Sequence, residues 1–303
     1  MDIYLPIANM SVNALFIVAL GGLVGVLSGL FGVGGGFLTT PLLIFYGIPP
    51  SVAVASATTQ ITGASVSGVF AHLKRGGVDL RMGLVMIAGG LVGSLAGALL
   101  FRLAQASGQI DTIIGLLYVA LLGSIGALML RDAITALGWW KKGEEAKPRP
   151  RHHKLIAVLP IRWRFYASGL YISPLAPAAL GFVAGILTVL LGIGGGFILV
   201  PAMIYLLGMA PRVVVGTSLV MILAVSAATT MIHALTTQAV DIVLAALLLI
   251  GGVVGAQYGA RLTTRLKPDL LRFSLAAIIL LVALRMAIGL TYRPDELFSI
   301  EYL

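Results

Sequence analysis

Eight long apolar runs limit what this chain can fold into. Each contains about 19–24 residues, and a helix of that length, rising 1.5 Å per residue, crosses the roughly 30 Å hydrocarbon core of a bilayer. Only 10% of all residues are charged, against about 25% in soluble domains, so a soluble enzyme is excluded. We expect an all-α polytopic membrane protein. The runs lie at 11–31, 50–73, 82–103, 110–130, 174–192, 212–235, 241–262 and 269–290.

Two shorter apolar runs, 37–48 and 197–209, each lie between a triple glycine and a proline-containing turn. At about 12–13 residues they are shorter than an ordinary span, so half-helices, re-entrant segments and short spans all stay open. The prediction is therefore about 8–10 transmembrane helices, two of them short or re-entrant.

Blocks of sequence recur in the same order on both sides of a basic segment. The matched blocks are 29–50 and 189–211, His72 and His233, Val78-Asp79 and Val240-Asp241, and 89–98 and 251–260. We therefore expect two five-segment repeats, residues 1–130 and 173–303. A basic cytoplasmic linker, residues 131–172, joins them and carries interfacial aromatic residues.

Lys and Arg residues are distributed unevenly between the loops. Seventeen of the 20 lie at 74–81, 131–164, 212 and 261–272, and the positive-inside rule places these segments in the cytoplasm. The loop at 236–241 has neither residue and is expected outside. An odd number of crossings then separates it from the linker, which inverts the second repeat and leaves both termini outside. Topology thus explains the net charge of +9, and the expected partner is the lipid bilayer, not nucleic acid.

The triple glycines form the first group of candidate binding residues. A helix that starts after such a break offers unpaired N–H groups and the positive end of its dipole to an anion. We expect the two breaks to face each other near the membrane midplane and to bind an anion. The alternative is that they only permit a tight hairpin with close packing. The residues are Gly34, Gly35, Gly36, Gly194, Gly195 and Gly196.

Small polar side chains inside the runs form the second group. Hydroxyl and amide donors can hold an oxyanion without a buried cation. Ser56, Thr59 and Gln60 fall on one helix face by their spacing. The alternative for the hydroxyls is hydrogen bonding between helices or to carbonyls one turn earlier. The full group is Ser56, Thr58, Thr59 and Gln60 in the first repeat and Thr217 and Ser218 in the second.

Three cationic or titratable residues complete the candidates. His72 and His233 end equivalent helices and could carry a proton or pair with an anion, or could simply cap the helices. Arg285 lies about five residues inside the last run and could face an anion path or extend to the outer surface. No acidic residue lies near the centre of a run, and the chain has no cysteine. We expect no catalytic residue, metal site or cofactor.

Glycines spaced four residues apart predict close packing of helices rather than chemistry. They occur at Gly21/Gly25/Gly29, Gly89/Gly93/Gly97, Gly181/Gly185 and Gly251/Gly255/Gly259.

The ordered set of motifs resembles the TauE/SafE sulfite-exporter (TSUP) family. It comprises GVGGGF (32–37), Pro41, the turn at 47–50, His72 and Gly77-Val78-Asp79, and the second half repeats it with Pro201, His233 and Val240-Asp241. The resemblance implies a secondary transporter in the bacterial inner membrane that moves sulfite, thiosulfate or an organosulfonate such as sulfoacetate or taurine. It usually implies export, and alternating access of the inverted repeats would be the mechanism. An anion channel or passive pore of similar architecture is the alternative.

Overall fold

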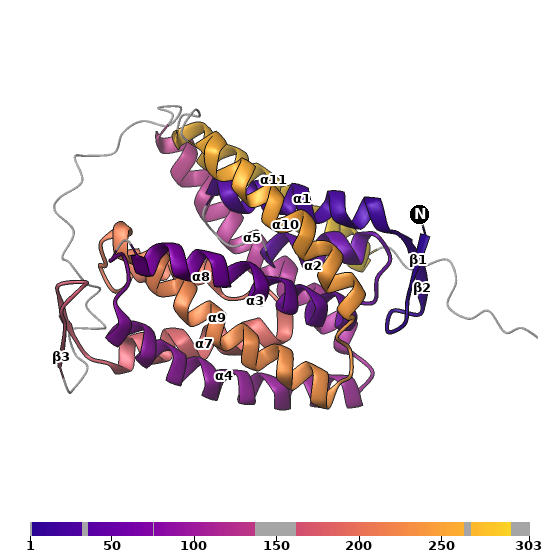
Figure 1. Ribbon diagram of the computed structural model, residues 1–303, viewed down its shortest axis with the longest axis horizontal. Coiled ribbons are helices and arrows are strands. Elements are labelled where there is room, and N and C mark those ends of the chain that lie inside the picture. Colours follow the sequence, from indigo (N-terminus) through magenta and orange to yellow (C-terminus); the bar gives the residue numbers. More distant parts are fainter. Residues whose placement is uncertain (1, 32–35, 75, 137–161, 264–267, 292–303) are drawn as a thin grey trace, which may run out of the picture.

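The computed structural model describes residues 2–31, 36–74, 76–136, 162–263 and 268–291. Within these ranges the chain forms ten helices and two short β-hairpins (Figure 1). The helical elements correspond to the eight long runs and the two short ones, and the prediction of an all-α polytopic membrane fold is confirmed. The helices are α1 (Ala14–Phe31), α2 (Gly36–Phe45), α3 (Pro50–Lys74), α4 (Leu80–Ala106), α5 (Ile110–Ala136), α7 (Leu175–Leu191), α8 (Gly196–Tyr205), α9 (Pro211–Thr236), α10 (Ile242–Thr263) and α11 (Pro268–Thr291).

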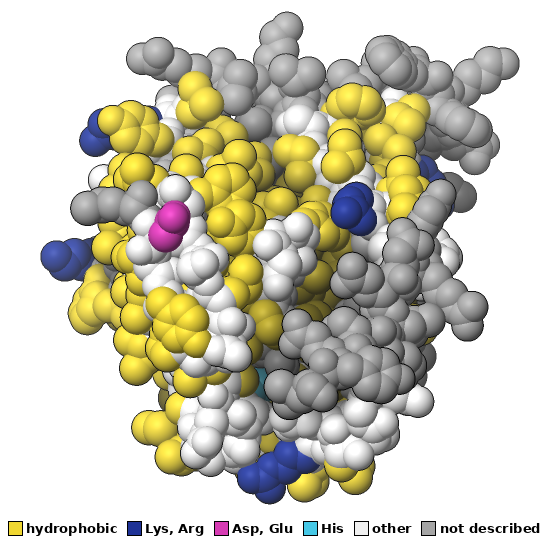
Figure 2. All heavy atoms as spheres, turned by 90° about the vertical axis from the view of Figure 1, so that its right-hand side faces the viewer, with side chains coloured by type: hydrophobic (Ala, Val, Ile, Leu, Met, Phe, Trp, Pro, Cys, Tyr) yellow, Lys and Arg dark blue, Asp and Glu magenta, His cyan; other side chains and the backbone are white. Residues whose placement is uncertain are grey.

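Among the described residues, five helices are both long enough and apolar enough to cross a membrane: α4, α5, α9, α10 and α11. Helix α3 has 25 residues, but its internal Ser, Thr and Gln side chains lower its hydropathy. Helices α1 and α7 have 18 and 17 residues. Figure 2 shows the end of the molecule that carries the β1–β2 hairpin, where few charged side chains are visible among the described residues.

Helices α2 and α8 have ten residues each, about 15 Å of helix, which is half of what a crossing needs. Helix α2 returns to the end of the bundle where α1 begins. There the Phe16 and Tyr46 rings stack with centroids 4.7 Å apart, and the Asn13 N–H donates to the Tyr46 hydroxyl at 3.4 Å. The pair α1–α2 is therefore a hairpin whose two ends lie at the same end of the molecule.

Two antiparallel β-hairpins lie at opposite ends of the molecule in Figure 1. One contains β1 (Asp2–Leu5) and β2 (Met10–Asn13), and the other contains β3 (Trp163–Phe165) and β4 (Leu170–Ile172). Leu5 and Phe165 on their inner faces are fully buried. Neither hairpin was predicted from the sequence, and the second falls within the segment predicted as the linker.

Helices from different halves pair along most of their length. Helix α1 packs on α10, and the equivalent α7 packs on α4, while α3 packs on α9 and α5 on α11. Glycines allow this approach, because a Cβ added at Gly93 would collide with the Phe182 carbonyl and one at Gly255 with the Gly22 carbonyl. The predicted role of the glycine stripes in close packing is confirmed, and the two halves interlock rather than lying side by side.

Candidate functional site

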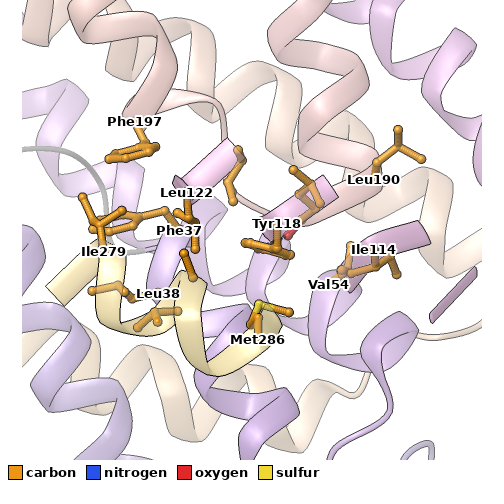
Figure 3. Packing of buried hydrophobic residues seen from close by; sticks show 14 of the residues in the cluster. Phe37, Leu38, Val54, Ile114, Tyr118, Leu122, Leu190, Phe197, Ile279 and Met286 are labelled. Carbon is orange, nitrogen blue, oxygen red and sulfur yellow. Dashed lines mark hydrogen bonds between the residues drawn. The ribbon is translucent and has the colours of Figure 1, made fainter. Parts of the chain in front are cut away.

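The N-terminal ends of the two short helices meet inside the bundle. Phe37 at the start of α2 and Phe197 at the start of α8 stack with ring centroids 4.7 Å apart and planes at 10° (Figure 3). A Cβ added at Gly36 would lie 3.1 Å from the Gly192 carbonyl oxygen. Each short helix reaches about 15 Å inward from its own end. Two such helices that meet tip to tip together account for about 30 Å, the thickness of a hydrocarbon core.

The segment 192–195 between α7 and α8, here called the second glycine break, has an unusual backbone. The φ angles of Gly192, Gly194 and Gly195 are 67°, 64° and 73°. This is a left-handed backbone conformation that residues other than glycine rarely adopt. Gly195 caps α8, and its carbonyl accepts the N–H groups of Ile198 and Leu199 at 3.0 and 2.8 Å. The N–H groups of Gly196 and Phe197 precede these bonds, have no partner within their helix and belong to buried residues. Gly196 is the first residue of α8. Gly34 and Gly35 of the first break lie outside the described residues.

The carbonyl groups at the end of α7, just before this break, are occupied by side chains. Nε2 of the buried His233 lies 3.1 Å from the Val189 carbonyl oxygen, and its ring meets Phe101 edge-on at 4.9 Å. The Tyr118 hydroxyl donates to the Leu191 carbonyl (Figure 3). These side chains thus satisfy carbonyl groups at the negative, C-terminal end of α7, whereas the positive, N-terminal end of α8 lies at the break.

Tyr118 was missed from sequence. The available signal was a lone tyrosine in the middle of an apolar span, because a buried phenol group requires a hydrogen-bond partner.

Helices α3 and α9 face each other through a seam of hydroxyl groups. The Thr59 and Thr230 hydroxyl oxygens lie 3.4 Å apart, and the Thr62 hydroxyl donates to Ser226 Oγ at 3.0 Å. The Thr58 and Thr59 hydroxyls also donate to carbonyls one turn earlier. The structure therefore places Thr59 in a polar seam between the two halves, whereas the hydrogen bond of the Thr58 hydroxyl stays within α3.

Gln60 occupies an asymmetric position. Its Oε1 accepts a hydrogen bond from the buried Thr39 hydroxyl at 3.1 Å, and a Cβ added at Gly252 would lie 2.9 Å from its Nε2. In the second half, Met221 lies against Gly90 in the corresponding place. The two halves thus share this packing position, but only the first places an amide there.

The Ser56 and Thr217 hydroxyls join the two halves. Ser56 Oγ accepts the Asp241 N–H at 3.1 Å, and Thr217 Oγ1 accepts the Asp79 N–H at 2.9 Å. These are equivalent contacts, each from the Val-Asp turn of one half to the polar helix of the other. The Ser218 hydroxyl donates to a carbonyl of its own helix at 3.0 Å.

The two aspartates extend these contacts to the hairpins. Each carboxylate caps its own helix, α4 or α10, by accepting a backbone N–H at 3.0 Å. Asp79 Oδ2 also accepts the Ser168 N–H at 3.0 Å and the Ser168 hydroxyl at 2.7 Å. Asp241 Oδ2 accepts the Ile7 N–H at 3.2 Å. We call Asp79 with Thr217 and Ser168 the Asp79 anchor, and Asp241 with Ser56 and Ile7 the Asp241 anchor. In the sequence, the repeated Val-Asp pair was the only sign of them.

The remaining candidates lie elsewhere. The Arg285 side chain is exposed, its guanidinium is 5.2 Å from the centre of the Phe45 ring, and it lines a surface cavity of about 270 Å³ with Asp111. His72 is half-buried in the last turn of α3. Across the described ranges, no three His, Cys, Asp or Glu side chains gather as a metal site.

The sequence profile described as Sulfite exporter TauE/SafE matches residues 17–286. The chain belongs to this family. A probable membrane transporter protein of Xylella fastidiosa (strain Temecula1) is 30% identical over 287 residues, covering 94% of this chain and 97% of the relative. The probable membrane transporter protein YjnA of Bacillus subtilis (strain 168) is 30% identical over 271 residues, 89% of this chain and 98% of that relative. No solved structure matches the chain significantly.

Membership of the TauE/SafE family confirms the resemblance drawn from the motifs and makes the chain a multi-pass membrane transporter. The matched region contains the hydroxyl seam and the second glycine break, and it ends just beyond Arg285.

Proposed function

We propose that the protein is a secondary transporter that exports a small sulfur-containing anion, such as sulfite, thiosulfate, sulfoacetate or taurine, across the bacterial inner membrane. The observation that carries this proposal is the meeting of α2 and α8 at their N-terminal ends, marked by the Phe37–Phe197 stack. Two helix N-termini directed at one buried region favour an anion. The description of the family as sulfite exporters supports the choice of sulfur oxoanions.

The proposed site holds its anion with neutral donors. The backbone at Gly36 and at Gly194, Gly195 and Gly196 supplies N–H groups. Thr58, Thr59 and Gln60 supply hydroxyl and amide groups at the start of the seam, while Ser56 and Thr217 serve mainly as anchors between the halves. Neutral donors leave no unpaired buried charge when the site empties, which suits a carrier that must return without cargo.

Alternating access of the two halves is the proposed mechanism. In Figure 1, α1 starts at the end that carries β1 and β2, whereas the equivalent α7 starts at the opposite end, beside β3. The Asp241 anchor lies at the first end and the Asp79 anchor at the second. We propose that release of one anchor opens the site to one side of the membrane while the other anchor stays closed.

Counterflow in proteoliposomes tests the proposal. Vesicles preloaded with unlabelled sulfite, thiosulfate, sulfoacetate or taurine should transiently accumulate the labelled anion above equilibrium, because a carrier exchanges its substrates. An anion channel of similar architecture, the second candidate, would show flux without counterflow.

A matched pair of glycine variants tests the site. Gly195→Leu should abolish exchange, since φ is 73° and a Cβ there would press on Ala184 at 3.1 Å. Gly169→Leu imposes the same strain, with φ at 66°, in a hairpin turn with nothing within 4 Å. Gly169→Leu should therefore retain exchange. If Gly195→Leu exchanged the anion as well as Gly169→Leu does, the glycine break would not be part of the binding site.

A further inference from the structure

A cationic cavity of about 520 Å³ lies between the β3–β4 hairpin and the start of α4. Three arginines line it: Arg81, Arg162 and Arg164. The Arg81 guanidinium lies 5.2 Å from the centre of the Tyr166 ring, a stacking that leaves its in-plane N–H donors able to bind an anion. The described residues that line the cavity include no Asp or Glu.

The rest of the lining is aromatic and apolar. Trp163 and Tyr171 are about half exposed, at 52% and 57%, and such amphipathic rings favour the headgroup region of a membrane. On the α4 side the cavity continues into Leu84, which is 63% exposed, and Val85. Guanidinium groups above an exposed leucine face form a surface that matches a phosphate headgroup above acyl chains.

The β1–β2 hairpin, which is the equivalent hairpin of the first half, has no arginine at the corresponding positions. In its register, strand β1 has Asp2, Ile3 and Tyr4 where β3 and its approach have Arg162, Trp163 and Arg164. Both hairpins bury their inner faces in the same way, so the fold does not require the arginines. The neighbouring linker is itself basic, with six Lys or Arg and two Glu at 141–154, which makes it a poor occupant for a cationic cavity.

We propose that this cavity binds the phosphodiester headgroup of an anionic membrane lipid, with Arg81, Arg162 and Arg164 on the phosphate and the acyl chains along Leu84 and Val85. The site is separate from the transported anion and does not depend on the proposed function. Tyr166 and Ser168 belong to one turn, so a bound lipid lies beside the Asp79 anchor and stabilises the hairpin against α4.

Quenching of Trp163 fluorescence by brominated lipids tests this proposal. The full-length protein with Trp139→Phe and Trp140→Phe retains Trp163 as its sole tryptophan. In nanodiscs, brominated phosphatidylglycerol should quench Trp163 more strongly than brominated phosphatidylcholine at equal mole fraction. Arg162→Gln with Arg164→Gln should reduce the preference by about fivefold for each arginine removed. Arg102→Gln, also an exposed arginine of α4 but near its other end, should leave the preference unchanged.

Equal quenching by the two lipids in the parent protein, or equal loss of preference in Arg102→Gln, would overturn the site. A second arm separates lipid from free phosphate by thermal unfolding. Phosphatidylglycerol nanodiscs should raise the unfolding temperature of the parent but not of the double variant. If inorganic phosphate added to phosphatidylcholine nanodiscs produced the same rise, the ligand would be a soluble anion and the lipid assignment would fail.

Discussion

At the scale of single residues, a substitution at Gln60 can distinguish a role in binding the anion from a role in packing. Met221 lies against Gly90 as Gln60 lies against Gly252, so Gln60→Met should fit its surroundings while removing the amide. If the amide binds the anion, affinity should fall roughly tenfold or more, the cost of about 1.5–3 kcal/mol for a hydrogen bond to a charged group. Isothermal titration with the best substrate measures this. Met221→Leu is the control, and unchanged affinity in Gln60→Met would leave Gln60 a packing residue.

The two anchors should differ in strength. The Asp79 carboxylate accepts three hydrogen bonds, two of them from Ser168, whereas Asp241 accepts two. We expect Asp79→Ala to cost about 2–4 kcal/mol, from loss of the helix cap and the charged hydrogen bonds, and Asp241→Ala to cost less. Thermal unfolding in detergent measures both. Ser168→Ala removes the 2.7 Å bond and a longer contact of 3.4 Å to the Phe165 carbonyl, and its cost should be smaller than that of Asp79→Ala; the reverse order would contradict the anchor.

At the scale of helices, the contact between α4 and α7 depends on glycine at specific positions. A Cβ at Gly93 collides with backbone atoms of Phe182, whereas one at Gly123 in α5 meets nothing within 4 Å. Gly93→Ala should therefore lower the unfolding temperature and the yield of folded protein. Gly123→Ala should be neutral or stabilising, by up to about 1 kcal/mol, because alanine favours helix more than glycine. Similar destabilisation by both would mean that helix packing is not the reason for the stripe.

The elements were predictable to the extent that their sequence determines them locally. An apolar run of membrane length has few alternatives to helix, and each long run and both short ones are helical over most of their length in the structure. The hairpins were not predicted because their strands have three or four residues, too few for an alternation of apolar and polar residues to be recognised. Burial of Leu5 and Phe165 against the bundle stabilises them, and that contact is tertiary.

At the scale of the whole molecule, the sequence proposes residues for the candidate site but does not show which residues they contact. The sequence identified the glycine breaks and the polar helix α3. It could not show that Ser56 meets Asp241, 185 residues away, because that contact depends on how the halves interlock. The repeat nevertheless relates the two contacts, because Thr217 and Asp79, at the equivalent positions, make the equivalent contact.

The orientation of the whole molecule in the membrane can be tested at its two hairpins. Ser11 in β2 and Ala167 in the β3–β4 turn are both exposed, and the chain has no native cysteine. The excess of Lys and Arg on one side predicts that the β3–β4 end is cytoplasmic. Ser11→Cys should therefore react with a membrane-impermeant maleimide in spheroplasts, whereas Ala167→Cys should react only after the membrane is permeabilised. Labelling of both from outside would contradict the inversion of the repeats, because equivalent hairpins of inverted repeats must lie on opposite sides. Labelling of Ala167→Cys alone would retain the inversion but reverse the orientation and with it the assigned cytoplasmic linker.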